Sequence, residues 1–307
     1  MRVYLFHGGD TRIFSVKVQE ENIEQIPHII PSPRPRNRAL PLYEIESIKE
    51  EIISRPTFFE HFDRVVIDWK YLRHREKDIL AQEAKWINVQ KLGVIVNASS
   101  GINLYPDIRL VNNMEREYLP SMNHIENVIE KMSVIGSHDL ILSLHPAIYV
   151  NILESRTSAW FDSTFSEVCK KAEKHNIIIH LRTSYGKPPK SLKEAVEFIN
   201  RVGAPNLRLA PSTGLLLAEK VNLEEMRTLI KDKISLWFVS APAFDDNEIL
   251  LHINTPIFKY NDKSLLSDII SVAPEVPLLL DGLYNNYDEE YLDIYTLERL
   301  LMNMSDK

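Results

Sequence analysis

The stretch KSLKEAVEFINRVGAPNLRLAPSTGLLL, residues Lys190–Leu217, has the pattern of a helix, a tight turn and a buried strand. Ser191 is suited to cap the helix, Glu194 stands three residues later, and apolar residues then recur at helical spacing. Gly203 ends the helix, because glycine readily adopts the left-handed conformation found after a last turn. The apolar run Leu207–Ala210 follows at once and predicts a strand.

The same alternation of short apolar runs and helical patterns extends through the whole chain. The runs are nearly continuous in apolar residues, which is typical of parallel strands covered by helices on both faces. Eight strands and eight helices in 307 residues predict a (β/α)8 TIM barrel, in one domain spanning residues 1–307. The strands are expected at Val3–Phe6, Arg64–Asp68, Gly93–Ala98, Leu140–His145, Ile177–Thr183, Leu207–Ala210, Ser235–Ser240 and Pro277–Asp281. The helices are expected at Ile45–Ile53, Glu76–Val89, His124–Met132, Thr164–His175, Leu192–Asn200, Leu223–Ile230, Leu265–Val272 and Glu289–Met302.

The first unit has an alternative. Val3–Phe6 could pair with Ile13–Val18 as a hairpin across the turn between them, which would leave the barrel one strand short. After that unit, the segment Pro31–Pro41 is rich in proline and arginine and is expected to be an extended connection. Its arginines could bind an anion or a proline-motif partner, or it could be a solvated linker.

Charge and composition restrict the partners. The formal net charge is −7, with 43 acidic and 36 basic side chains, so the chain has no overall field that attracts nucleic acid or an anionic membrane. The single cysteine, Cys169, has no intrachain disulfide partner and is expected to be a buried structural thiol. We find no signal peptide pattern and no apolar run long enough to span a bilayer, so a cytoplasmic location is expected. A homo-oligomer is possible.

The segment from Asn176 to Gly214 resembles the xylose isomerase-like TIM barrels, a family of sugar and sugar-phosphate isomerases and epimerases, and the resemblance extends to Tyr284. It implies a divalent metal held by a strand-end Glu, an Asp-Thr-Gly-His motif, a later His and a closing Glu. In this chain those positions hold Arg182; Ser212 and Leu215; Val239, Ser240 or Pro242; and Asp281.

These substitutions predict a degenerate metal site and no cofactor. Divalent cations need several oxygen or nitrogen ligands around one point, whereas a single carboxylate beside a guanidinium repels a cation. Arg182 is instead expected to pair with Asp281 or Asp68, as a structural ion pair in place of the metal.

In a barrel of this class the site lies at the carboxyl ends of the strands. The polar residues expected there could supply a carboxylate to take a proton, an imidazole to return it and a guanidinium to hold an oxyanion. Each also has a structural interpretation, as an ion pair or a strand-end cap. The candidate catalytic residues are Asp68, His145, Arg182 and Asp281, and the candidate substrate-binding residues are Trp69, Lys70, Asn97, Ser184, Ser212 and Ser240.

Three functions therefore remain open. The first is a barrel that binds a sugar or related small molecule without a divalent metal. The second is a metal-independent isomerase, epimerase or lyase that uses His145, Asp68, Asp281 and Arg182. The third is a non-catalytic scaffold that contacts a protein partner. Nothing in the sequence matches a phosphate-cradling loop, a dinucleotide fingerprint or a zinc motif.

Overall fold

Eight parallel strands form the framework of the chain in a computed structural model that describes residues 3–5, 64–90, 92–98, 115–143, 155–183, 189, 191–230, 232–284 and 287–305. All eight agree with the strands expected from the sequence to within a few residues at each end. They are β1 (Val3–Leu5), β2 (Arg64–Asp68), β3 (Gly93–Asn97), β4 (Asp139–Leu142), β5 (Ile178–Arg182), β6 (Leu207–Ala210), β7 (Trp237–Val239) and β10 (Leu278–Leu280).

The strands neighbour one another in the order in which they occur along the chain. One sheet has the order β2-β3-β4-β5-β6, and a second has the order β1-β10-β7. Parallel bridges from Leu209 to Ile234 and from Ser212 to Phe238 connect β6 to the segment of β7. The parallel pairing of β1 with β10 gives the first strand the place that a (β/α)8 barrel requires. Its alternative partner, Ile13–Val18, lies outside the described residues.

Strand residues alternate between the interior of the barrel and the layer under the helices. One buried cluster is small and takes residues from six strands and from Leu236, which precedes β7: Val66, Ile95, Ile141, Ala210, Leu236, Phe238 and Leu279. Their neighbours in sequence, such as Val65, Ile67 and Trp237, belong to the larger cluster that includes the helices. Because side chains in a strand point alternately to opposite faces, the residues at positions 68, 97, 182 and 281 share the inner face.

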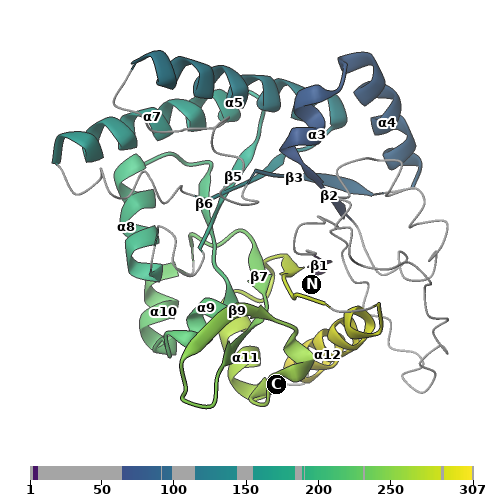
Figure 1. The fold of residues 1–307 in the computed structure, drawn as a ribbon, viewed down its shortest axis with the longest axis vertical. Helices are drawn as coiled ribbons and strands as arrows, with labels where there is room; N and C mark the ends of the chain where they lie inside the picture. Colours follow the sequence, from purple (N-terminus) through teal and green to yellow (C-terminus); the bar gives the residue numbers. More distant parts are fainter. Residues whose placement is uncertain are drawn as a thin grey trace.

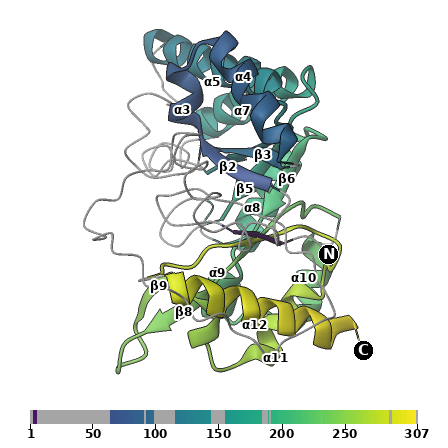
Figure 2. The same cartoon turned by 90° about the vertical axis from the view of Figure 1, so that its right-hand side faces the viewer.

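The described helices lie on the outside of the strands (Figures 1 and 2). In Figure 1, α4, α5, α7 and α8 lie along the outside of β2–β6, and α10, α11 and α12 lie on the side of β7 and β10. The helices are α3 (Trp69–His74), α4 (Lys77–Val89), α5 (Glu115–Ile135), α7 (Ser155–Glu173), α8 (Leu192–Val202), α9 (Thr213–Ala218), α10 (Leu223–Ile230), α11 (Lys263–Ile270), α12 (Tyr287–Ser305) and the short 3-10 helix η2 (Ile257–Lys259). The short helices α3 and α9 were not expected, and the expected helix Ile45–Ile53 lies outside the described residues.

The helix–turn–strand that decides the fold has the local structure that its sequence predicts. The Ser191 hydroxyl caps α8 by accepting a hydrogen bond from the backbone N–H of Glu194 at 3.2 Å. Gly203 follows the last turn with a φ of 66°, and its N–H donates to the carbonyl of Ile199. The apolar face of α8 is buried, and Phe198 meets Phe165 of α7 edge to face with ring centroids 5.1 Å apart.

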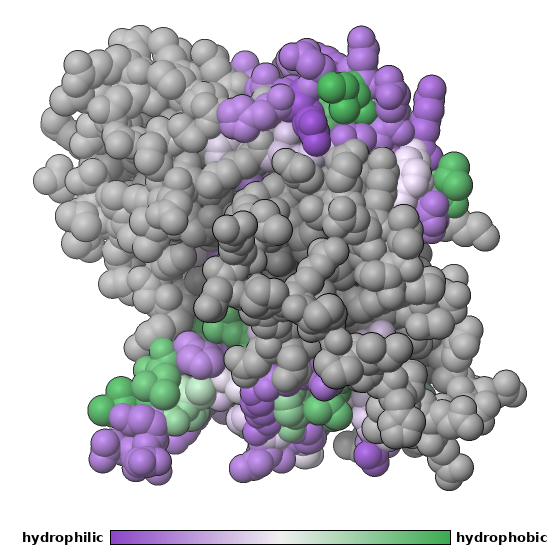
Figure 3. Space-filling model, turned by 45° about the vertical axis from the view of Figure 1, so that its right-hand side comes forward, coloured by the Kyte–Doolittle hydropathy of each residue, from purple (hydrophilic) through white to green (hydrophobic). Residues whose placement is uncertain are grey.

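A hairpin between β7 and η2 is the main feature that sequence analysis missed. Strands β8 (Ala241–Phe244) and β9 (Leu250–Thr255) pair with each other in antiparallel fashion and form a separate two-stranded sheet. Asp245 fixes the turn, because its carboxylate accepts the backbone N–H groups of Asn247 and Ile249 at 2.9 and 2.8 Å. The hairpin projects at the lower left in Figure 3, where hydrophobic surface adjoins hydrophilic surface; its exposed apolar residues are Phe244, Ile249 and Leu251.

Other expectations have mixed outcomes. Cys169 is fully buried in α7, as expected, and burial raises the pKa of its thiol to about 12. The connection Pro31–Pro41 lies outside the described residues, and the single-domain assignment stays a prediction. Among the helices that the structure describes, none combines the length and the apolar character needed to cross a bilayer.

Candidate functional site

The first two candidate residues meet at the carboxyl ends of neighbouring strands. Asp68 is the last residue of β2 and Asn97 is the last residue of β3, and the two are paired in register. Both are fully buried. Their strands place them on the inner face, one step beyond Val66 and Ile95 of the interior cluster. They therefore lie at the mouth of the barrel, as expected.

Trp69 and Lys70 differ from expectation in their local structure. The expected strand Arg64–Asp68 is confirmed as β2, but the unexpected helix α3 begins directly after it at Trp69. Trp69 has an exposed fraction of 0% and packs in the outer cluster, so its ring offers no accessible face for a sugar in this structure. The backbone turns directly from strand to helix here. A role for either residue in substrate binding stays a prediction.

Arg182 and Asp281 form the centre of the mouth. A guanidinium nitrogen (Nη2) of Arg182, at the end of β5, donates to Oδ2 of Asp281, directly after β10, at 2.5 Å. This ion pair, expected from the sequence, is confirmed. The guanidinium carbon also lies 4.3 Å from the ring centroid of Phe238 in β7, an arrangement in which a cation is attracted to the aromatic face.

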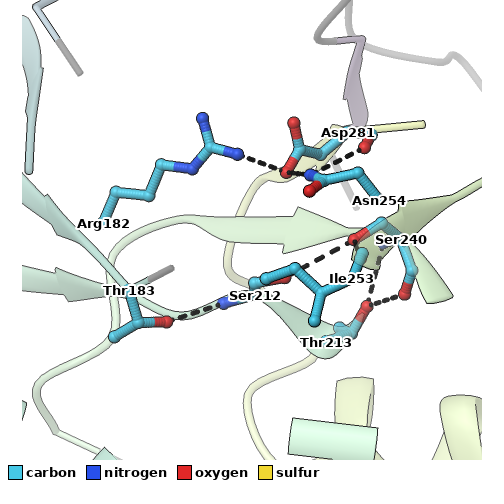
Figure 4. A network of polar contacts seen from close by, with 8 residues as sticks. All are labelled: Arg182, Thr183, Ser212, Thr213, Ser240, Ile253, Asn254 and Asp281. Carbon is cyan, nitrogen blue, oxygen red and sulfur yellow. Dashed lines mark hydrogen bonds and ion pairs between the residues drawn. The ribbon is translucent and has the colours of Figure 1, made fainter. Parts of the chain in front are cut away.

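Asn254 of β9 completes this cluster, although sequence analysis did not identify it. Its side-chain N–H donates to the same oxygen, Oδ2 of Asp281, at 2.5 Å and to the backbone carbonyl of Asp281 at 3.2 Å (Figure 4). We call Arg182, Asp281 and Asn254 the mouth cluster. The signal for Asn254 was the turn sequence Asp245-Asp246-Asn247 between two apolar runs, which predicts a hairpin that returns a strand to the barrel.

Burial dominates the electrostatics of Asp281. The residue is 2% exposed, and loss of solvent raises the pKa of its carboxyl to about 6, even though Arg182 and Asn254 act in the opposite direction by stabilising the ionised form. A carboxyl with a pKa in this range can gain or lose a proton near neutral pH, which suits it to exchange protons with a ligand.

The segment Ser212-Thr213-Gly214 contacts the root of the hairpin (Figure 4). Ser212 precedes α9, and Thr213 is its first residue. The Thr213 hydroxyl donates to the carbonyl of Ser240 at 2.6 Å and accepts the N–H of Ser240 at 3.0 Å. The Ser240 hydroxyl donates to the carbonyl of Ile253 in β9 at 2.7 Å. Ser212 receives its own support from Thr183, whose hydroxyl accepts the Ser212 N–H at 3.1 Å.

Gly214 allows the hairpin to approach α9 at backbone distance. A Cβ atom at this position would lie 2.0 Å from the carbonyl oxygen of Ile253 and 2.9 Å from the Ser240 hydroxyl. Only glycine fits this contact without displacing the chain. The sequence Ser212-Thr213-Gly214 therefore fixes the root of the hairpin against the mouth. Ser212 and Ser240 are fully buried, and both take part in hydrogen bonds within this network.

Two candidates lie outside the described residues. His145, the expected imidazole, and Ser184, an expected substrate contact, are not among the residues that the structure describes. Their proximity to the mouth cluster stays a prediction that follows from their positions after β4 and β5.

A second buried polar group lies behind the loop that follows β10. The Tyr284 hydroxyl donates to Oδ2 of Asp293 in α12 at 2.8 Å, and the backbone N–H of Phe258 donates to Oδ1 at 2.8 Å. Burial raises the pKa of Asp293 to about 7 despite these donors. The contacts connect α12 and η2 to the loop that carries Asp281, and thus support the mouth from outside.

A third polar group lies at the opposite, amino-terminal end of the barrel. His180 of β5 contacts Asp139 through Nε2 at 2.9 Å and Ser235 through Nδ1 at 2.8 Å. Asp139, the first residue of β4, also pairs with Arg64, the first residue of β2. His180 and Arg64 hold the pKa of Asp139 below its ordinary value, against the effect of burial. Polar residues at this end of such barrels contribute to stability, so we assign the group to the framework.

The strand order, the alternating inner face and the polar carboxyl-terminal mouth define a (β/α)8 barrel. A family profile described as xylose isomerase-like TIM barrel matches residues 65–241, more than half of the chain. The chain belongs to this family. No curated protein sequence matches it significantly.

Solved structures agree in fold at low sequence identity. D-psicose 3-epimerase with D-tagatose from Clostridium cellulolyticum is similar with a TM-score of 0.61 at 9% identity, over 86% of this chain and 93% of that chain. A 3-keto-D-glucoside 4-epimerase from E. coli has a TM-score of 0.59 at 14% identity, over 82% and 95%. A xylose isomerase-like barrel protein from Mycobacterium smegmatis in complex with magnesium has a TM-score of 0.56 at 11% identity, over 84% and 90%. At these identities the likeness concerns the fold alone.

The residues of the mouth do not fit the divalent metal that the family implies. Among the side chains that the structure describes, no three His, Cys, Asp or Glu residues gather as metal ligands. More directly, the one carboxylate at a ligand position, Asp281, has an oxygen that accepts both the Arg182 guanidinium and the Asn254 amide. The positive charge of Arg182 lies against Asp281, where a second cation would be repelled.

Proposed function

We propose that this chain binds a sugar or a related polyhydroxylated small molecule at the carboxyl-terminal mouth of its barrel, without a divalent metal. The observation that carries the proposal is the mouth cluster, in which Arg182 and Asn254 hold Asp281. A guanidinium there supplies the positive charge that a metal supplies elsewhere, and it needs no further ligands. The cluster is nearly neutral in total, which favours a ligand that offers hydroxyl groups.

Two further observations support the proposal. Asp68 and Asn97 are fully buried polar residues at the ends of the neighbouring strands β2 and β3, and their positions on the inner face direct them toward the same mouth. Solved relatives in fold include D-psicose 3-epimerase in the presence of D-fructose. Sugars present many hydroxyl donors and acceptors, which suit a site made of carboxylate and amide groups.

A thermal-shift titration tests the proposal. Unfolding is followed with D-fructose, D-tagatose and D-xylose, each with excess chelator and again with Mn²⁺. A ligand that binds only the native state raises the midpoint of unfolding by an amount that grows with the logarithm of its concentration relative to its Kd. We expect one of the sugars to raise the midpoint equally with chelator and with Mn²⁺.

The matched variants are Asp281→Ala in the mouth and Asp246→Ala in the exposed hairpin turn. The shift is expected to disappear in the first and to persist in the second. A shift that requires Mn²⁺ contradicts metal independence. No shift with any sugar contradicts ligand binding and favours the scaffold interpretation.

Proton transfer on such a ligand is a second candidate function, favoured by the pKa of about 6 for Asp281. Asp281 would take a proton from a carbon next to a carbonyl, the C–H electron pair would form a C=C bond, and the π electrons of the carbonyl would move to its oxygen. A protonated imidazole, His145, would then return a proton to carbon as the carbonyl forms again. Proton exchange from sugar carbon into deuterated water, measured by NMR, tests this candidate. Wild-type exchange that is abolished in Asp281→Asn supports it, and absence of exchange contradicts it.

A further inference from the structure

We infer that Asn254 is a positioning residue for Asp281, supplied to the mouth by the β8–β9 hairpin. The inference deepens the proposed function and rests on it, because it assigns a role in the same site. It starts from an asymmetry in the Asp281 carboxylate. Arg182 and Asn254 both donate to Oδ2.

Neither donor uses the other oxygen, Oδ1, which keeps its capacity to accept a hydrogen bond. Within the described part of the chain, no side chain or backbone group donates to it, and Figure 4 shows it pointing away from both Arg182 and Asn254. A carboxyl group rotates about its Cβ–Cγ bond unless its oxygens are held. Two donors on one oxygen fix that rotation and leave the second oxygen as an acceptor in a defined direction.

Asn254 is itself held in place from two sides. Its side-chain amide also donates to the backbone carbonyl of Asp281. The backbone carbonyl of Asn254 accepts the backbone N–H of Leu283 at 2.8 Å. The preceding residue, Ile253, is bound by Ser240 and lies against Gly214. The hairpin therefore presents the amide on a rigid backbone, as the supporting residues of a preorganised site require.

Asn254 is distinct from Arg182 in the kind of control that it provides. Arg182 contributes a positive charge. The neutral amide of Asn254 instead fixes the orientation of the Asp281 carboxylate, because it donates to both the side chain and the backbone of Asp281. Both donors stabilise the ionised carboxyl and lower its pKa relative to burial alone. Loss of the Asn254 amide is therefore expected to raise the pKa of Asp281 and to release its rotation.

The test compares Asn254→Ala with Asn247→Ala, a control in the exposed turn of the same hairpin. The first readout is the pKa of Asp281, measured by carbon NMR of aspartate-labelled protein and assigned with Asp281→Asn. The second is the affinity for whichever of D-fructose, D-tagatose and D-xylose stabilises the wild type. In Asn254→Ala we expect a higher pKa of Asp281 and an affinity lower by about tenfold or more, the loss typical of a hydrogen bond to a charged group.

Asn247→Ala is expected to leave both readouts unchanged. If Asn254→Ala does not fold, Asn254→Asp keeps the shape of the side chain, removes the donor, and is expected to raise the pKa of Asp281 further. An unchanged pKa of Asp281 in the folded variant overturns the inference, even if sugars bind. A raised pKa in a protein that binds none of the three sugars upholds the positioning role and contradicts the proposed function, so the two failures are distinguishable.

Discussion

Replacement of Gly214 by alanine tests the packing that anchors the hairpin at the mouth. The new Cβ would lie 2.0 Å from the carbonyl oxygen of Ile253, far inside van der Waals contact, and 2.9 Å from the Ser240 hydroxyl. Because one obstacle is backbone, it cannot rotate away, and β9 must shift. Alanine would otherwise favour the helix α9 by about 1 kcal/mol relative to glycine.

The opposing effects are larger. Overpacking of this kind costs about 1–3 kcal/mol, and a shift of β9 breaks the hydrogen bond from Ser240 to Ile253, which contributes about 1 kcal/mol. The helical gain offsets about 1 kcal/mol of these two costs. Because the overlap with backbone is severe, we expect Gly214→Ala to lower the free energy of unfolding by roughly 2–3 kcal/mol. Urea unfolding followed by circular dichroism measures the change.

Gly93→Ala is the matched control. The three atoms nearest to its Cβ would all belong to the Arg64 side chain, the closest at 3.1 Å, and these can adjust. The free energy of unfolding of Gly93→Ala is expected to differ from that of the wild type by no more than about 1 kcal/mol, as is usual for a tolerated substitution. If Gly214→Ala is as stable as the wild type, the close contact between α9 and β9 is absent, and the reasoning about the hairpin fails.

Three further predictions concern buried ionisable groups. Arg182→Met leaves Asp281 without its charge partner and is expected to lower the free energy of unfolding by about 3–5 kcal/mol at pH 8. The loss is expected to be smaller at pH 5, because the carboxyl is protonated there. Equal losses at the two pH values, measured by urea unfolding, would contradict this. Asp293 has a pKa raised to about 7, so the stability associated with its protonated form is present at low pH and lost as the pH rises through 7. Asparagine cannot ionise, so between pH 4 and pH 8 the free energy of unfolding of Asp293→Asn is expected to rise by up to about 4 kcal/mol relative to that of the wild type. A difference in free energy of unfolding that does not change with pH would refute the assignment. Cys169, with a pKa raised to about 12 and no exposed surface, is expected to resist a thiol reagent in the native protein and to react fully in urea; rapid native labelling would contradict its burial.

The barrel strands could be predicted because their signal is local. Each is a short apolar run buried on both faces, and its neighbours along the chain are also its neighbours in space. The two ends of α8, capped by Ser191 and followed by Gly203, could likewise be predicted from a few adjacent residues. Errors arose where an element begins without a loop, as α3 does directly after Asp68.

The site could be predicted only in part. Arg182 and Asp281 were identified because each replaces a residue that the family pattern demands, so their pairing across 99 positions followed from the fold. Asn254 has no such pattern. The turn Asp245-Asp246-Asn247 signals a hairpin, but Asn254 reaches the mouth only because that hairpin packs onto α9. This packing depends on contacts with Gly214 and Ser240 that the turn sequence does not specify.

The metal content of the protein tests the central claim most directly. The claim is that Arg182 and Asn254 hold Asp281 in place of a divalent cation. The protein is incubated with Mn²⁺, Mg²⁺ and Zn²⁺, desalted and analysed by mass spectrometry for bound metal, beside Asp281→Ala. We predict that the wild type retains no stoichiometric metal and does not differ from the variant. One equivalent of metal that is retained by the wild type and lost in Asp281→Ala would contradict the claim.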